Sequence, residues 1–263
     1  MILKENIRWH KAFKILWKLN RVHVSKETSD AYKLFKKIYD KIKIISVDYK
    51  KKCGDWEVPP GWSVIKATVK DPKGKSLIDW KKNKLSLWTY SPSFVGKLSL
   101  DKFKSKILFD KKRPNASIFH FRNQYNFWKT EWGVSLPYKK YKKLKKGLYD
   151  INIKTKFYNH NLDLAEQVHK GKKKNSIIFV SHFDHPQMCV DGLSGCILGH
   201  EVLSNIKYKT KLTYRMISTP EIVGSVFYSN FYKKRNKIEE ALFIATPGAN
   251  QELSYQNSSN GNS

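Results

Sequence analysis

The sequence predicts an α/β protein with a doubly wound sheet, and three stretches after residue 175 lead to this fold class. The first, IIFVSH from residue 177, is a continuous apolar run of the kind that forms a strand buried on both faces. The second, CILGHEVLSNI from residue 196, has the spacing of an amphipathic helix. The third stretch begins at residue 211. It contains KLTYRMIS, PEIVGSVFYSNFY and EALFIAT, which predict a strand, a helix and a strand in that order. Strands that alternate with helices in this way are typical of a doubly wound sheet.

Two further helices are predicted near the start of the chain. Residues 9–19 place apolar side chains at close to helical spacing. A helix that docks on its own domain is favoured there over a helix that lies on a membrane surface. Residues 25–30 offer several N-cap side chains, beginning with Ser25. The apolar stripe that follows also has the helical period, and it consists of Ala31, Leu34, Phe35, Ile38 and Ile42.

The middle of the chain predicts a small antiparallel β unit. GDWEVPPGW, from residue 54, is too rich in proline to be helix interior. WSVIKATV, SLIDW and KLSLWTYS predict short strands, and the turn DPKGK separates the first two. Residues 99–108 predict a short helix capped by Ser99, and the lysine run 139–146 predicts the solvated face of a helix. The end of the chain is polar and predicts a disordered tail.

The composition predicts a folded protein with an unusual charge. Of the 263 residues, 40% are hydrophobic and 14% aromatic, which is enough for a substantial core. Lys and Arg number 51 against 22 Asp and Glu, so the net charge is +29. Only six of the basic residues are Arg, and the rest are Lys. Because proteins that read nucleic acids usually use Arg as well as Lys, a coding bias towards A/T-rich codons is the favoured interpretation, and an anionic partner is the alternative. We expect non-specific binding to polyanions at low salt in either case.

The cysteine content and the hydropathy pattern bear on the compartment. Three cysteines without a Cys-x-x-Cys pair exclude a disulfide framework and a thiolate zinc ribbon, and an odd number favours a reducing compartment. Charges interrupt the first 21 residues, and no segment approaches 18 consecutive apolar residues. We therefore expect a cytoplasmic protein without a transmembrane segment.

Polar side chains gather at the predicted carboxyl ends of two strands. His182, Asp184 and His185 follow the first strand, Asp191 comes shortly after them, and Glu221 follows the next strand. Ligand sites in doubly wound sheets lie beyond these strand ends. Imidazole nitrogen and carboxylate oxygen form the ligand set of hydrolytic zinc, and a neighbouring carboxylate can take a proton from water. The alternative is that Asp191 caps the following helix and that the histidines are satisfied loop residues.

Several motifs occur in an order that matches a known family. SHFDHPQMCVDGLSG, followed by TPEIVGS, is similar to a Cys-His-Pro…Asn-Asp-x-Leu-Ser-Gly block that precedes a Pro-Glu-Thr-Ile-Gly-Ser block. Upstream, GDWEVPPGW, KLSLWTYS and TEWGVSLPYKKYKKLKKGLYDINI are similar to further motifs in the same order. The chain therefore resembles the M28 zinc aminopeptidases, and more closely their divergent relatives, the aminopeptidase-like domain family (DUF2172/DUF4910). The likeness runs from about residue 21 to residue 249.

This resemblance implies a zinc-peptidase-like (M28-type) α/β fold with a small inserted β domain. The implied parts are an N-terminal helical part (1–54), the inserted β-rich domain (55–115), the α/β peptidase-like domain (116–250) and the disordered tail (251–263). The family's motif histidine falls on His185 and its motif aspartate on Asp191. The register of the wider M28 group instead places the metal-binding histidine at His182, so both histidines remain candidates. Glu221 matches the general base, and a peptide or amide is the implied substrate.

The departures from the family pattern predict a weakened or missing activity. Ile222 stands where the wider group has a second, metal-binding Glu, and the segment 246–249 lacks the carboxylate of the close family. No His follows His200, whereas the resembling proteins continue with a part that supplies another ligand. We therefore expect at most one zinc ion and a C-terminally truncated hydrolase domain that is weakly active or inactive. The alternatives are a catalytically inactive fragment or pseudoenzyme, and a basic protein that binds polyanions.

Overall fold

The apolar segments after residue 175 form the centre of a five-stranded mixed sheet. Its strands lie in the order β1-β10-β12-β11-β13. They are β1 (Lys43–Val47), β10 (Leu162–His169), β11 (Ser176–His182), β12 (Thr213–Thr219) and β13 (Ile238–Phe243). β11 pairs in parallel with both β12 and β13, whereas β1 and β10 run antiparallel to their neighbours.

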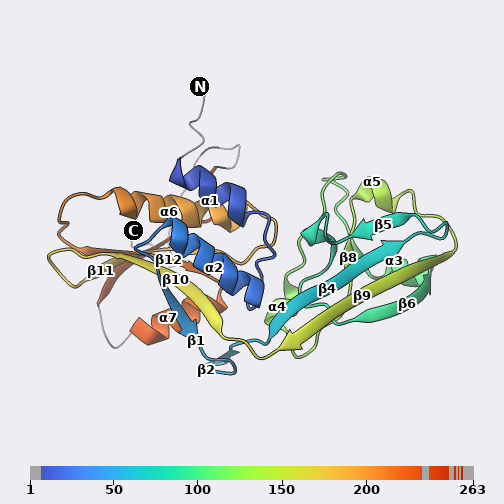
Figure 1. The fold of residues 1–263 in the computed structure, drawn as a ribbon, viewed down its shortest axis with the longest axis horizontal. Coiled ribbons are helices and arrows are strands. Elements are labelled where there is room, and N and C mark those ends of the chain that lie inside the picture. The colour runs from blue at the N-terminus through green and yellow to red at the C-terminus, as the bar shows by residue number, and fades with distance from the viewer. Residues whose placement is uncertain (1–6, 233–236, 249–251, 253, 255, 257–263) are drawn as a thin grey trace.

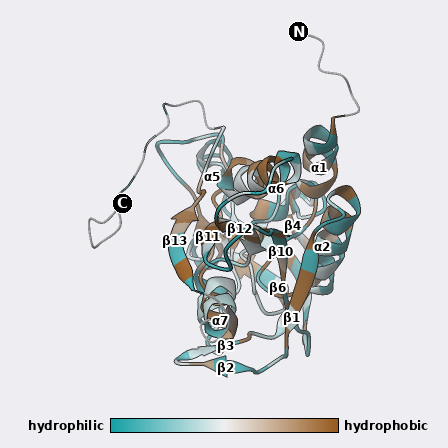
Figure 2. Cartoon of the chain, turned by 90° about the vertical axis from the view of Figure 1, so that its left-hand side faces the viewer, coloured by the Kyte–Doolittle hydropathy of each residue, from teal (hydrophilic) through white to brown (hydrophobic). Residues whose placement is uncertain are grey.

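Helices cover both faces of this sheet, which confirms the predicted α/β class (Figure 1). They are α1 (Arg8–Leu16), α2 (Lys26–Ile38) and α6 (Gly195–Asn205) on one face and α7 (Val223–Tyr232) on the other. On the first face, Phe35 of α2 and Ile197 of α6 pack in one apolar cluster with Phe183. On the second, Phe227 of α7 packs against Ile217. The helix α2 carries both colours in Figure 2, as expected of an amphipathic helix on a sheet.

A second, antiparallel sheet lies beside the first (Figure 1). Its strands, in the order β5-β4-β9-β6, are β4 (Gly61–Lys70), β5 (Ser76–Asp79), β6 (Phe94–Ser99) and β9 (Leu148–Tyr158). A cluster of its own, which includes Trp62, Phe103 and Ile151, forms the core of this part. The shorter elements are β2 (Lys52–Cys53), β3 (Trp56–Glu57), η1 (Lys84–Ser86), α3 (Leu100–Lys104), β7 (Ile107–Leu108), α4 (Arg122–Tyr125), β8 (Val134–Ser135), α5 (Tyr138–Tyr141) and η2 (Val190–Ser194).

Several local expectations need correction. KLSLWTYS was expected to be a strand, but its start is the 3-10 turn η1, because the Asn83 side chain accepts a hydrogen bond from the Leu85 N–H. The helix expected over 99–108 ends after α3, and the helix expected over 139–146 is limited to α5. The division into domains stays a prediction. The strand pairing nevertheless shows that β9, which lies outside the range 55–115, belongs to the antiparallel sheet.

The computed structural model describes residues 7–232, 237–248, 252, 254 and 256. The predicted disordered tail, 251–263, falls mostly outside this range and stays a prediction. Within the described range, no helix has both the length and the apolar character that a membrane crossing requires.

Replacing Ser25 by alanine should lower the free energy of unfolding by about 1 kcal/mol. The buried Ser25 Oγ caps α2 by accepting the Thr28 N–H at 2.9 Å, and the alanine variant leaves that donor without its partner. Ser99 is the matched control, because it precedes α3 without a side-chain cap bond. Ser99→Ala should change stability by no more than about 0.5 kcal/mol in urea unfolding. Equal losses in the two variants would contradict the capping role of Ser25.

Candidate metal centre

The site lies where two neighbouring parallel strands end. His182 is the last residue of β11, and its register partner in β12 is Thr219. The Phe183 N–H donates to the Thr219 carbonyl at 3.0 Å, so the two chains leave the sheet together. Because Glu221 follows β12 by two residues, its carboxylate comes to the edge that also carries the histidines. The predicted clustering at the strand ends is therefore present.

Three of the predicted residues place atoms that could bind a metal ion close together. We call these residues, His182, His185 and Glu221, the metal group. One ligand atom each from His182, His185 and Glu221 lies within 4.8 Å of the others. His185 Nε2 is 3.4 Å from Glu221 Oε2, and His182 Nδ1 is 3.7 Å from Glu221 Oε1. Among the described residues, this is the one group of three or more His, Cys, Asp or Glu side chains with such spacing. Two imidazoles and a carboxylate fit the ligand preference of zinc.

Asp191 lies on the opposite edge of the His185 ring. Its Oδ1 is 3.5 Å from His185 Nδ1, and its backbone carbonyl is 3.2 Å from the same nitrogen. A neutral imidazole carries a hydrogen on one of its two nitrogens. When that hydrogen is on Nδ1, which faces Asp191, Nε2 keeps a lone pair that can bind a metal ion. The structure thus brings all four predicted residues together, but it groups Glu221, not Asp191, with the two histidines.

The charges around His185 favour a cation at this position. Burial alone would lower the pKa of His185, but the Asp191 and Glu221 carboxylates raise it to about 10. The contact with His185 in turn lowers the pKa of Glu221. Burial lowers the pKa of His182, although the Asp184 and Glu221 carboxylates oppose this shift. A site that stabilises a protonated imidazole also favours a metal ion, since both are positive charges.

Asp184, the third polar residue after β11, faces away from the metal group. Its carboxylate is fully buried; Oδ1 accepts the Glu221 N–H at 2.9 Å, and Oδ2 lies 3.0 Å from His23 Nε2. The two atoms are close, but they are not aligned for a hydrogen bond. Burial would raise the pKa of Asp184, but His23 and the other two histidines hold it well below its usual range. Asp184 therefore holds the backbone of Glu221.

Sequence reasoning missed Tyr125, which contacts the site from α4. Its hydroxyl donates to Glu221 Oε2 at 2.6 Å, and burial together with this bond raises the pKa of the phenol. Tyr125 precedes Glu221 by 96 residues, and its surroundings, SIFHFRNQYNFW, indicate only an aromatic segment. No pattern in the sequence singles out this tyrosine.

Arg21, which was also missed, holds the loop that carries His185. Its side chain is completely buried and donates to the backbone carbonyls of Phe183, His185 and Met188 at 2.7, 2.8 and 2.8 Å, and to that of Leu16. Burial lowers the pKa of Arg21 to about 10, so the guanidinium is still charged at neutral pH. The loop after β11 is therefore fixed by one side chain from the segment before α2.

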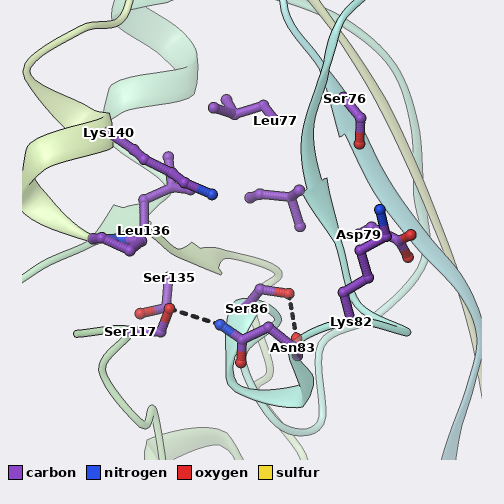
Figure 3. Close-up of a pocket in the computed structure, with 12 residues that line it drawn as sticks. Ser76, Leu77, Asp79, Lys82, Asn83, Ser86, Ser117, Ser135, Leu136 and Lys140 are labelled. Carbon is purple, nitrogen blue, oxygen red and sulfur yellow. Dashed lines mark hydrogen bonds between the residues drawn. The ribbon is translucent and has the colours of Figure 1, made fainter. Parts of the chain in front are cut away.

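One cavity, away from the strand ends, contains none of the predicted site residues. It has a volume of about 250 Å³ and lies between β5 and the segment that leads into α5 (Figure 3). Polar and apolar side chains both line it, and Asn83 Nδ2 donates to Ser117 Oγ there at 2.8 Å. The chemistry predicted from the sequence therefore lies at the strand ends and not in this cavity.

The fold and the group of histidines and carboxylates define an aminopeptidase-like α/β domain. The chain belongs to the family described as "Domain of unknown function (DUF4910)", whose family model matches residues 10–263. A Clostridium acetobutylicum protein named "Putative polysaccharide biosynthesis protein with aminopeptidase-like domain" is 29% identical over 193 residues, which are 73% of this chain and 44% of that protein. These findings confirm the resemblance inferred from the motifs.

Solved structures agree with this membership. A "putative peptidase" from Clostridium acetobutylicum matches with a TM-score of 0.80 and 25% identity, over 90% of this chain and 55% of that one. A zinc aminopeptidase from Bacillus subtilis matches with a TM-score of 0.54 and 11% identity, over 93% of this chain and 70% of that one. At this identity, the second match shows the fold alone. The chain spans about half the length of the Clostridium relatives.

Proposed function

We propose that this chain is a zinc-binding hydrolase domain of the M28 aminopeptidase type that cleaves a peptide or amide bond weakly or not at all. The observation that carries this proposal is the convergence of His182, His185 and Glu221 within 4.8 Å at the strand ends. Three protein ligands and one open position are the usual arrangement of a hydrolytic zinc site. When bound, zinc would supply a Lewis acid for the carbonyl of the substrate. Membership of the aminopeptidase-like family supports the same chemistry.

The role of Glu221 decides how active the domain is. Its carboxylate is held by the Tyr125 hydroxyl and its backbone by Asp184. We propose that Glu221 completes the metal group with the two histidines. A carboxylate used in this way is poorly available as the general base that hydrolysis also needs. In the competing arrangement, Asp191 is the third ligand and Glu221 remains free to accept a proton.

The substrate class and the surroundings of the protein are part of the proposal. A peptide or amide substrate is supported by the aminopeptidase-like family, and activity of the longer relatives transfers to this chain only as a proposal. The cytoplasmic location and the non-specific binding of polyanions at low salt stay predictions from composition. An inactive domain that keeps the metal group is the second candidate, because the same carboxylate would have to serve two roles.

Chelator-stripped protein should bind about one zinc ion per chain, and Glu221→Gln should separate the two roles of this residue. If Glu221 is a ligand, the substitution should weaken zinc binding by more than about tenfold, since it removes the anionic donor. If Glu221 is the base, zinc binding should persist while any hydrolysis of aminoacyl-arylamides disappears. Titration calorimetry and arylamine release measure the two effects. Glu131→Gln is the control, because Glu131 is paired with Lys106 away from the site. Absence of zinc binding by the unmodified protein would overturn the proposal.

A further inference from the structure

A larger cavity lies next to the metal centre and is not explained by metal binding. It has a volume of about 860 Å³ and is lined by the β2–β3 hairpin and by residues 124–128, at the end of α4 and just beyond it. Figure 1 places β2 and α4 at the junction of the two sheets. Cavities of this size are large enough for a small organic ligand.

Four aromatic side chains line this cavity. Trp56 comes from the hairpin, and Tyr125, Phe127 and Trp128 come from the second segment. The rings of Trp56 and Tyr125 meet edge to face, with their centroids 6.4 Å apart. Trp128 exposes 73% of its surface, although an indole gains more from burial than almost any other side chain. Exposed aromatic surface around a cavity is typical of a place where an apolar group binds.

One buried amide that borders this cavity has no hydrogen-bond partner. Gln124 is 1% exposed and lines the cavity, and neither its Nε2 nor its Oε1 makes a hydrogen bond. The amide is close enough to the Tyr125 hydroxyl to act on the pKa of that phenol, but the pair lacks hydrogen-bond geometry. Because a buried amide is costly when unsatisfied, a ligand with one donor and one acceptor would be favoured here.

Two residues that line the cavity connect it to the metal centre. Tyr125 forms part of the wall and binds Glu221 Oε2 through its hydroxyl. His23 also lines the cavity, and it contacts Asp184, which holds the Glu221 N–H. A substrate whose reacting group lies at Glu221 would therefore have this cavity beside it.

We infer that this cavity, which we call the aromatic pocket (Trp56, Gln124, Tyr125, Phe127 and Trp128), binds an aromatic amino-acid side chain together with its neighbouring amide. The inference rests on the proposed function and names its substrate class, a peptide or amide with an aromatic residue beside the bond to be cleaved. The aromatic rings would contact the side chain, and the Gln124 amide would pair with the amide of the ligand. A sugar is the competing ligand class, because Asp55 and Asn126 also line the cavity, and the four aromatic rings favour an aromatic side chain over it.

The test uses the full chain, treated with a chelator, so that binding does not depend on zinc. L-Phenylalaninamide should bind at least about tenfold more tightly than L-alaninamide in titration calorimetry, since the smaller side chain leaves the aromatic walls empty. Trp56→Ala and Gln124→Leu should each weaken binding of L-phenylalaninamide by about fivefold or more. Tyr208→Ala, which removes an exposed aromatic ring elsewhere, should leave it unchanged. Trp128→Ala gives an independent readout if the buried Gln124 variant does not fold.

Several results would overturn the aromatic pocket. Equal affinity for the two amides would do so, as would unchanged binding in both Trp56→Ala and Trp128→Ala. Binding of N-acetylglucosamine in place of L-phenylalaninamide would assign the cavity to a sugar instead. Zinc titration of the same variants separates this inference from the proposed function, because neither tryptophan belongs to the metal group. If the unmodified protein binds the amide but not zinc, the proposed function fails and the aromatic pocket stands.

Discussion

Replacing His185 by alanine should weaken zinc binding by more than about tenfold, and His182→Ala should have an effect of the same order. Loss of a residue that merely orients a ligand already costs about 10–100-fold in affinity, so loss of a ligand itself should reach or exceed that range. His185 is 3% exposed and lies between two carboxylates, and among the described residues only the group that contains it has the spacing of a metal site. Competition titration with a chromophoric chelator measures the change.

Asp191→Ala distinguishes the two ligand sets. If Asp191 only faces His185 Nδ1, the variant should lose less affinity than either histidine variant, because the Asp191 backbone carbonyl still faces that nitrogen. If Asp191 is the third ligand in place of Glu221, Asp191→Ala should weaken binding as strongly as either histidine variant, and Glu221→Gln should leave it largely intact. His169→Ala is the matched control, since His169 lies at the far end of β10. Zinc binding that survives His185→Ala would show that the site lies elsewhere.

Arg21→Met should lower the free energy of unfolding by at least about 3 kcal/mol. Four backbone carbonyls lose a charged donor, and a buried acceptor left unsatisfied costs roughly 1–3 kcal/mol, part of which water can relieve. Domains have a total stability of about 5–15 kcal/mol, so this is a large fraction. Zinc affinity should fall in the same variant, because the loop that positions His185 loses its anchor.

The controls for Arg21 separate charge from shape. Arg21→Lys keeps the positive charge but cannot present a planar fork to several carbonyls, so it should fall between Met and the native residue. Arg113→Met removes an exposed guanidinium that lies 3.8 Å from Asp110, and it should change stability by no more than about 0.5 kcal/mol in urea unfolding. If Arg21→Met is as stable as Arg113→Met, the loop after β11 is held by other contacts.

Much of the central sheet and the place of its site could be predicted from local patterns. The apolar run at 177–182 is a strand, and the stripe that begins at residue 31 lies on α2 after the cap Ser25. Parallel strands bring their carboxyl ends together, so His182, His185, Asp191 and Glu221 could be expected at one edge before any contact was known. These predictions succeeded because each depends on spacing within a short segment or on a general rule of topology.

The antiparallel part was less predictable. KLSLWTYS contains the residues of a strand, yet Asn83 turns its start into η1, because a side-chain bond competes with strand pairing. β9 joins the sheet from beyond residue 147 and pairs with β4 and β6. Alternation of apolar residues does not identify which distant strand becomes the neighbour.

The class of fold, the family and the four polar residues at the strand ends could all be inferred from sequence patterns. Only the packing of the folded chain shows that Glu221 groups with the two histidines while Asp191 lies behind His185. It also brought Tyr125 to Glu221 and Arg21 to the loop after β11, across separations of 96 and 162 residues. The physical reason is that a hydrogen bond depends on the placement of two backbones within a few tenths of an ångström. Packing of whole elements sets that placement, and no local pattern encodes it.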